Sequence, residues 1–422
     1  MLSKKNIIRS IIILFMAILL GFLLLIISYL IPFHRILLGC ANSINTFVEE
    51  GSYPLTVEGY ENSKLDNYSD GAMFNFAIYH GDESTVEKAV MNYWYTYQDK
   101  NPMESFISYL WEEDGYSVQS YSRYWHGFLV YLKPLLLFFD YTDIRLINGL
   151  FQILMICLIS WQLGQKRLGK YSIPLCLTYF FLSPVALMHS LQYSAVMNVA
   201  LFSTFMMLAF EETLSRNNWY LEAFLITGIL TSYLDMLTYP LFSLGMPLIY
   251  FIIVRIRRQD TNKYLLLSVI THSISWAVGY IGMWAGKWLI SMLYAGKQEL
   301  DSALNTIAYR SVGGLEETEN SVLTVIQNNL IMYDKPLYKA ILLTVVLFCV
   351  FMVAYSCYKR KDTSHLLSGL LRLVPFLLIF VMPFGWYVVT ANHAAIHTWF
   401  TCKTLGVSLL AFFSCILTIG QD

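Results

Sequence analysis

The sequence predicts an all-α integral membrane protein with about ten transmembrane helices and a large first extracellular loop. Of its 422 residues, 56% are hydrophobic and only 14% are charged, whereas soluble domains carry roughly 25% charged residues. The hydrophobic residues come in blocks of about 20, the length that a helix needs to cross hydrocarbon. Lysine and arginine gather beside some of these blocks and not beside others. The whole chain, 1–422, is therefore expected to form a single polytopic membrane domain.

The first hydrophobic block is expected to be a retained helix. It is longer than the hydrophobic region of a signal peptide, and no small-residue cleavage site follows it. Nine further blocks have the length and composition of spans. The ten blocks cover residues 10–32, 145–164, 171–188, 195–213, 219–238, 240–257, 264–286, 338–357, 368–390 and 401–419.

Basic residues fix the expected orientation, because short cytoplasmic loops are enriched in lysine and arginine. With ten spans, every basic cluster falls on the same side of the membrane. Both termini are then cytoplasmic. The clusters are Lys4, Lys5 and Arg9; Lys166, Arg167 and Lys170; Arg255, Arg257, Arg258 and Lys263; and Lys359, Arg360 and Lys361.

This topology leaves two large segments on the outer side. The first extracellular loop, 33–139, is rich in acidic residues, with 14 Asp and Glu against 5 Lys and Arg over residues 33–124. Its last part, 123–139, is apolar but is interrupted by Lys133 and Pro134, so it is expected to lie in the outer interface as a helix. The second extracellular loop is expected to cover residues 287–335.

Acidic residues supply the first candidates for chemistry. Asp66 and Asp70 lie four residues apart and share a face if their segment is helical. Such a pair could hold a cation or act as a base, although Asn, Ser, Asp and Gly around it also favour a solvated turn. Asp235 lies near the outer end of the fifth span, where an acid marks a site or a pairing partner. The alternative is that Asp235 caps the turn at Tyr239 and Pro240.

Histidines and outer basic residues supply the second group. His393 and His397 are spaced to share a helix face and could bind a metal or an anion together, or could be interfacial anchors. Arginine on the outer side opposes the topological preference, so an anionic partner is expected there. Candidate binding residues are Arg123, His126, Lys287, Arg310 and Lys403. The aromatic run from Tyr93 to Tyr97 could stack on a sugar, but an interfacial belt is the preferred interpretation.

Several common motifs are missing from the sequence. It has no phosphate-binding Walker loop, dinucleotide fingerprint, nucleophile elbow or zincin helix. ATP-driven and hydride-transfer chemistry are therefore not expected. Nothing in the charge pattern indicates nucleic-acid binding.

The layout resembles the GT-C class of membrane glycosyltransferases, such as protein O-mannosyltransferases and aminoarabinose transferases. The resemblance rests on one helix followed by a large outer loop with the acids Asp66 and Asp70, the interrupted segment 133–136, and a helix opening with 143–146. The second half resembles uncharacterised multi-pass proteins of Gram-positive bacteria, through residues 235–240 and 392–400. One departure is that the two acids follow the first helix by more than thirty residues, whereas those of GT-C enzymes follow it closely.

The resemblance implies a glycosyltransferase of a bacterial cell membrane. It would transfer a hexose or pentose, with inversion, from a polyprenyl-phosphate donor to an extracytoplasmic cell-envelope glycan or lipid. Asp66 or Asp70 would act as the base, and His393, His397, Lys403 and Arg310 would bind the departing phosphate. A divalent cation, Mg²⁺ or Mn²⁺, is compatible with this chemistry but is not required. The alternative is a non-catalytic transporter or assembly subunit for lipid-linked envelope polysaccharide.

Overall fold

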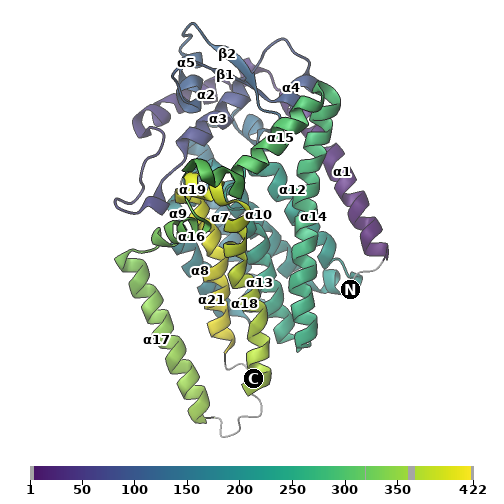
Figure 1. Cartoon of the computed structure of the whole chain (residues 1–422), viewed down its shortest axis with the longest axis vertical. Helices are drawn as coiled ribbons and strands as arrows, with labels where there is room; N and C mark the ends of the chain where they lie inside the picture. Colours follow the sequence, from purple (N-terminus) through teal and green to yellow (C-terminus); the bar gives the residue numbers. More distant parts are fainter. Residues whose placement is uncertain (1–3, 319, 360–365, 420–422) are drawn as a thin grey trace.

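The computed structural model describes residues 4–318, 320–359 and 366–419 and is almost entirely helical (Figure 1). Arg360 and Lys361, which belong to the last predicted basic cluster, lie outside the described residues. Among the described residues, six helical segments are long and apolar enough to cross a membrane. They are α1 (Lys4–Tyr29), α7 (Tyr141–Gln165), α10 (Leu191–Ala209), α14 (Asn262–Ala295), residues Leu371–Val389 of α18 (Leu366–Val389), and Thr398–Thr418, which includes α21 (Gly406–Thr418).

The other four predicted spans are also helical, and within the described residues their apolar segments are shorter than those of the six. The block 171–188 is divided into α8 (Ser172–Phe181) and α9 (Pro184–His189), because Ser183 adopts a φ of 62° before Pro184. The blocks 219–238, 240–257 and 338–357 correspond to α12 (Tyr220–Leu234), α13 (Leu241–Arg257) and α17 (Pro336–Lys359). The described residues are compatible with a multi-pass helical membrane protein and contain six candidate spans, so the prediction of ten spans is not confirmed.

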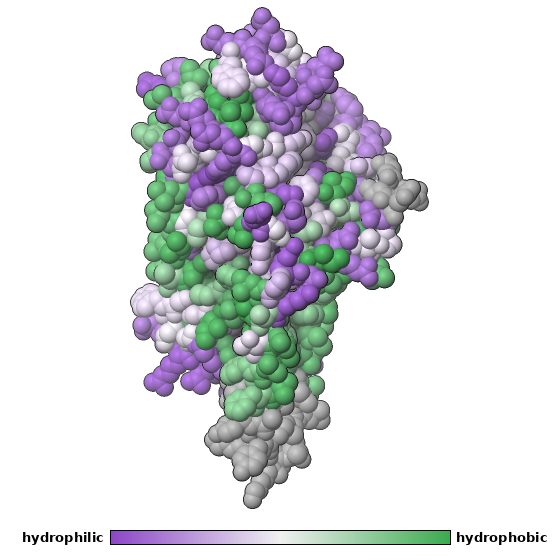
Figure 2. All heavy atoms as spheres, turned by 90° about the vertical axis from the view of Figure 1, so that its left-hand side faces the viewer, coloured by the Kyte–Doolittle hydropathy of each residue, from purple (hydrophilic) through white to green (hydrophobic). Residues whose placement is uncertain are grey.

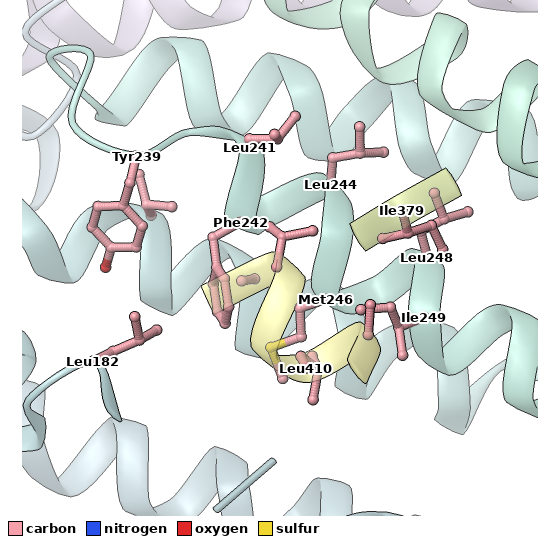
Figure 3. Packing of buried hydrophobic residues seen from close by; sticks show 14 of the residues in the cluster. Leu182, Tyr239, Leu241, Phe242, Leu244, Met246, Leu248, Ile249, Ile379 and Leu410 are labelled. Carbon is pink, nitrogen blue, oxygen red and sulfur yellow. The ribbon is translucent and has the colours of Figure 1, made fainter. Parts of the chain in front are cut away.

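The centre of the helical body is α13, which is buried along nearly its whole length. Figure 3 shows its side chains Phe242, Met246 and Ile249 packed among residues such as Leu410 of α21 and Ile379 of α18. Beside it, α12 and α14 approach each other closely. A Cβ on Gly279 would lie 2.1 Å from the carbonyl oxygen of Leu225. Small residues of this kind let helix backbones pack tightly in membranes.

Three of the predicted basic clusters meet at one end of this body. Glu211 forms an ion pair with Arg258, with 2.5 Å between nitrogen and oxygen. The same carboxylate oxygen lies 3.7 Å from the Nζ atom of Lys166. Near the same end of α12, buried Glu222 pairs with Arg9 at 3.0 Å. The ion pairs link α1, the α7–α8 loop and the end of α13, as expected if these clusters share one side of the membrane.

At the other end, the segment that follows α1 forms a polar layer (Figure 1; Figure 2 shows hydrophilic residues gathered at the top). A two-stranded antiparallel sheet, which the sequence did not predict, pairs Tyr93 with Ser120 and Thr96 with Ser117. The layer contains α2 (Phe33–Glu50), η1 (Glu61–Ser63), α3 (Asn67–Ile78), α4 (Thr85–Met91), β1 (Tyr93–Thr96), α5 (Pro102–Leu110), β2 (Ser117–Ser120) and α6 (Leu129–Leu135).

The segment after α14 completes this end of the molecule. Helix α14 runs to Ala295, so the predicted start of the second loop at 287 falls within a helix. Asn392 in α19 donates to the carbonyl oxygen of Tyr309 in α15 at 2.8 Å, which brings α15 beside the α18–α21 connection. The elements are α15 (Lys297–Arg310), η3 (Val312–Thr318), α16 (Val322–Ile331), α19 (Ala391–Ile396), α20 (Thr398–Thr401) and η4 (Cys402–Leu405).

Candidate functional site

A cavity of about 330 Å³ lies where the polar layer meets the helical body. Four of the predicted site residues line it: Asp66, Arg310, His393 and His397. They come from three distant parts of the chain, namely the start of α3, the end of α15 and the region of α19. The rest of the lining is largely aromatic, with Tyr53, Tyr68, Phe76, Trp94, Tyr121, Tyr124, Trp399 and Phe400.

Asp66 provides the acid of this cavity. It caps the N-terminus of α3, where its carboxylate accepts the backbone N–H of Ser69 at 3.0 Å. Only 1% of the residue is exposed. Burial raises the pKa of Asp66 to about 7, against the opposing effect of the Ser69 hydrogen bond. Near neutral pH, this carboxyl group can therefore both accept and release a proton.

Asp70 does not line the cavity, although the sequence paired it with Asp66. The segment is helical, but the Asp70 carboxylate points into the protein and anchors the start of α10. It accepts the backbone N–H groups of Leu191 and Gln192 at 2.8 Å each and the Tyr141 hydroxyl at 2.6 Å. Both acids are buried rather than solvated, with 1% of Asp66 and 0% of Asp70 exposed, and only Asp66 lines the cavity.

Arg145 of α7 connects the helical body to the polar layer. It was not among the predicted site residues. Its guanidinium makes two hydrogen bonds to the Glu50 carboxylate, at 2.7 and 2.9 Å, and one to Asn67 at 2.9 Å. Burial opposes ionisation of Glu50, but the hydrogen bonds and charge of Arg145 lower its pKa overall. Because Asn67 is the neighbour of Asp66, this ion pair fixes the start of α3 beside the cavity.

His393 and His397 lie together, with ring centroids 4.8 Å apart. The Nε2 atom of His393 is 2.7 Å from the carbonyl oxygen of Leu237, so this nitrogen carries the proton. Burial and the charge of Arg310 lower the pKa of His393 well below its usual range and that of His397 to about 4. Both rings are therefore neutral near pH 7 and cannot attract a phosphate by charge.

Arg310 joins this cavity to a second one. The second cavity, of about 370 Å³, is walled by apolar and aromatic side chains of α14, α15 and α18. Arg310 and Tyr124 line both cavities, and Arg310 donates to the Tyr124 hydroxyl at 2.5 Å. Arg123 lines the second cavity only. Ile281 of α14, which is 63% exposed, is one of the residues that line the second cavity.

Four further predicted residues line neither cavity and serve the fold instead. Asp235 caps a turn by accepting the Thr238 backbone N–H at 3.0 Å, as the alternative interpretation expected. Lys287 donates to the carbonyl oxygens of Ala89 and Val90, at 3.1 and 2.6 Å, near the end of α4.

The other two are also enclosed. Lys403 is fully buried and donates to the carbonyl oxygens of Asn62 and Leu182, at 2.6 and 3.2 Å, so it does not join the histidines at the cavity. His126 is buried, with Nδ1 3.0 Å from the Tyr124 carbonyl oxygen, and burial lowers its pKa well below the usual range. His126 packs against Phe76 and Tyr121 of the cavity wall, with ring centroids 4.3 and 5.5 Å apart, whereas Lys403 ties η1 to the end of α8.

No protein-family model, no curated protein and no solved structure matches this chain. The resemblance to GT-C enzymes therefore stays a prediction, and the cavity has to be interpreted from its own chemistry.

The aromatic residues of the cavity wall were not among the predicted site residues. Trp94 was assigned with its neighbours to an interfacial belt, but it belongs to β1 and lines the polar cavity. Its indole Nε1 is buried and has no hydrogen-bond partner in the described part of the chain. Tyr53 stacks on Tyr68, with centroids 5.8 Å apart, beside Trp399. Alternation along β1 could have indicated that Trp94 and Tyr95 face opposite sides.

Metal ligation finds little support in the residues of this site. Within the described ranges, no group of three or more His, Cys, Asp or Glu side chains is placed to hold a metal ion. Asp66 and the two histidines line one cavity without forming such a group. The cavity offers one carboxyl group, one guanidinium, two neutral imidazoles, the amide of Gln192, several hydroxyl groups and aromatic faces.

Proposed function

We propose that this protein is a membrane glycosyltransferase that moves a sugar from a polyprenyl-phosphate donor to an acceptor of the cell envelope on the outer face. The observation that carries the proposal is the pair of adjoining cavities. Asp66 and Arg310 line the polar cavity, and Arg310 with Tyr124 also lines the apolar cavity beside α14.

The two cavities match the three parts of such a donor. A polyprenyl chain suits the apolar cavity, whose wall opens along a candidate membrane-spanning helix. A phosphate would lie at the junction, where Arg310 can bind it by charge-assisted hydrogen bonds. The sugar would enter the polar cavity, where aromatic faces can pack on its C–H groups and the imidazoles can bond to its hydroxyls.

In the proposed reaction, Asp66 is the general base. It takes the proton of an acceptor hydroxyl while that oxygen forms a bond to C1 of the sugar. The bond between C1 and the phosphate oxygen breaks, and polyprenyl phosphate leaves with the bonding electron pair. Arg310 stabilises the charge that develops on the leaving phosphate. The neutral histidines orient the sugar and do not bind the phosphate, which revises their predicted role.

The test uses the full chain in proteoliposomes with a panel of radiolabelled polyprenyl-phosphate monosaccharides. Water serves as the acceptor, so release of free sugar reports cleavage. Asp66→Asn should reduce kcat by about 10²- to 10⁴-fold, the usual contribution of a general base. The fold should persist, because asparagine caps helices as well as aspartate does. Asp114→Asn, in the same loop and exposed, is the matched control.

Arg310→Ala should raise the KM for the donor about tenfold to a hundredfold, the effect of losing a hydrogen bond to a charged group. Arg310→Lys should recover part of this loss. Lys297→Ala, at the exposed start of the same helix, is the control. Transbilayer movement of the donor without cleavage by the wild-type protein would overturn the proposal in favour of a transporter.

A further inference from the structure

A third hollow, of about 570 Å³, adjoins the polar cavity. It is formed between α2 and α5, and its outer wall carries Trp111 at the end of α5. Trp111 is 57% exposed, and no other ring of the described chain stacks on its indole. Ser52, Lys100, Ser108 and Glu113 place polar groups around it.

The third hollow and the polar cavity share a thin wall. Ser52 lines the hollow, whereas its neighbour Tyr53 lines the polar cavity. In the same way, Met103 lines the hollow and Pro102 the cavity. The Ser52 hydroxyl accepts a hydrogen bond from Asn101 at 3.2 Å, which ties the two halves of the wall together. A ligand in the hollow therefore lies next to the space that contains Asp66.

The chemistry of the hollow suits a saccharide. An exposed indole offers a flat apolar face on which the C–H face of a sugar ring can pack. Hydroxyl and charged groups beside the indole can bond to the sugar hydroxyls. Lys100 donates to Ser108 at 2.6 Å and pairs with Glu113, so its charge is already neutralised. Glu104 adds a further carboxylate, which disfavours an anionic polymer.

We infer that the hollow at Trp111 binds the acceptor, and that the acceptor is an uncharged glycan of more than one sugar. This inference rests on the proposed function. The donor sugar occupies the polar cavity, so the terminal sugar of the acceptor has to extend over the rim formed by Ser52 and Asn101 to reach Asp66, while the following sugars lie against Trp111.

The test measures binding of oligosaccharides to the full chain in lipid nanodiscs. The probes are ladders of neutral hexose and N-acetylhexosamine oligosaccharides, from the monosaccharide to the hexasaccharide, and a sulfated ladder of equal length. Affinity should rise with the length of the neutral chains and should not rise for the sulfated ones. Trp111→Ala should weaken binding of the longer neutral chains about tenfold, the effect of losing one aromatic contact. Trp111→Tyr should retain most of the binding.

Trp161→Ala is the matched control, because Trp161 on α7 is also 57% exposed but lies away from the hollow. The inference is overturned if wild-type affinity does not increase with chain length, if the sulfated chains bind more tightly, or if Trp111→Ala binds like wild type. Quenching of Trp111 by brominated lipid would likewise overturn it in favour of a membrane anchor. Donor cleavage with water does not need the acceptor hollow, so failure here leaves the test of the proposed function intact.

Discussion

Asp66 and Asp70 lie four residues apart, and their carboxylates meet different surroundings. Asp66 keeps contact with a cavity and caps a helix, so its proton can be exchanged with a bound molecule. Asp70 is enclosed by donors from α7 and α10. A base needs an accessible lone pair, and only the first of these residues offers one.

Replacing Asp70 should therefore destabilise the protein rather than remove a catalytic group. Asp70→Asn puts an amide N–H₂ group near the N–H groups of Leu191 and Gln192, and each donor left unsatisfied costs about 1–3 kcal/mol. We expect a lower thermal midpoint in detergent, with activity lost in proportion to the folded fraction. Asp114→Asn serves as the exposed control. An unchanged midpoint with lost activity would instead return Asp70 to the catalytic group.

The pH profile should identify Asp66 as the titrating base. Because burial raises its pKa to about 7, the ionised form accumulates as the pH rises through that value. Below pH 7, kcat/KM for donor cleavage should rise about tenfold per pH unit, and it should level off above. If His397 were the base, the rising part of the profile would lie near pH 4, because its pKa is lowered to about 4. A profile that is flat between pH 5 and 8 would contradict the assignment.

At the scale of elements, the pair α12 and α14 depends on close backbone contact. A Cβ on Gly279 would lie 2.1 Å from a carbonyl oxygen of α12, so one helix would have to move. Gly279→Ala should lower stability by about 1–3 kcal/mol, as overpacking does. In contrast, Gly164→Ala on α7 meets open space and should be neutral or stabilising. Thermal unfolding of both variants in the same detergent measures the difference, and equal midpoints would contradict it.

The arrangement of α14, α15 and α18 also explains why Arg310 is available to both cavities. Asn392 ties α19 to Tyr309, the residue before Arg310. The guanidinium is thereby held at the junction, where Tyr124 accepts one of its hydrogen bonds. The position depends on two connections between segments more than 80 residues apart, and each is made by a single polar side chain.

For the whole molecule, the ion pairs bring three of the predicted basic clusters to one end of the helical body, and which side of the membrane this end faces stays a prediction. Arg9, Lys166 and Arg258 all pair with glutamates there, and the acidic polar layer lies at the other end. In a background without native cysteines, Ser84→Cys should react with an impermeant reagent added outside. Lys263→Cys should react only after the membrane is opened. Labelling of both from outside would contradict a cytoplasmic position for the basic end.

The sequence by itself indicated that the chain lies in a lipid bilayer, that it is helical, and that basic and acidic residues gather in different segments. These properties follow from composition and from the length of the apolar blocks, which are local quantities. It also predicted that four polar residues lie on the same, outer side of the membrane: Asp66, Arg310, His393 and His397. It did not predict where a helix breaks inside a block of continuous hydropathy, as at Ser183, where the backbone adopts a φ of 62°.

Only the tertiary structure decided which polar residues reach a cavity. Lys403 and Asp70 are as polar as Arg310 and Asp66, yet they are fully buried against backbone groups far away in the sequence. The two neutral histidines likewise owe their low pKa values to burial and to Arg310, which lies more than 80 residues earlier. A side chain's environment is set by its long-range neighbours, and these cannot be identified from its residue type or from spacing along the chain.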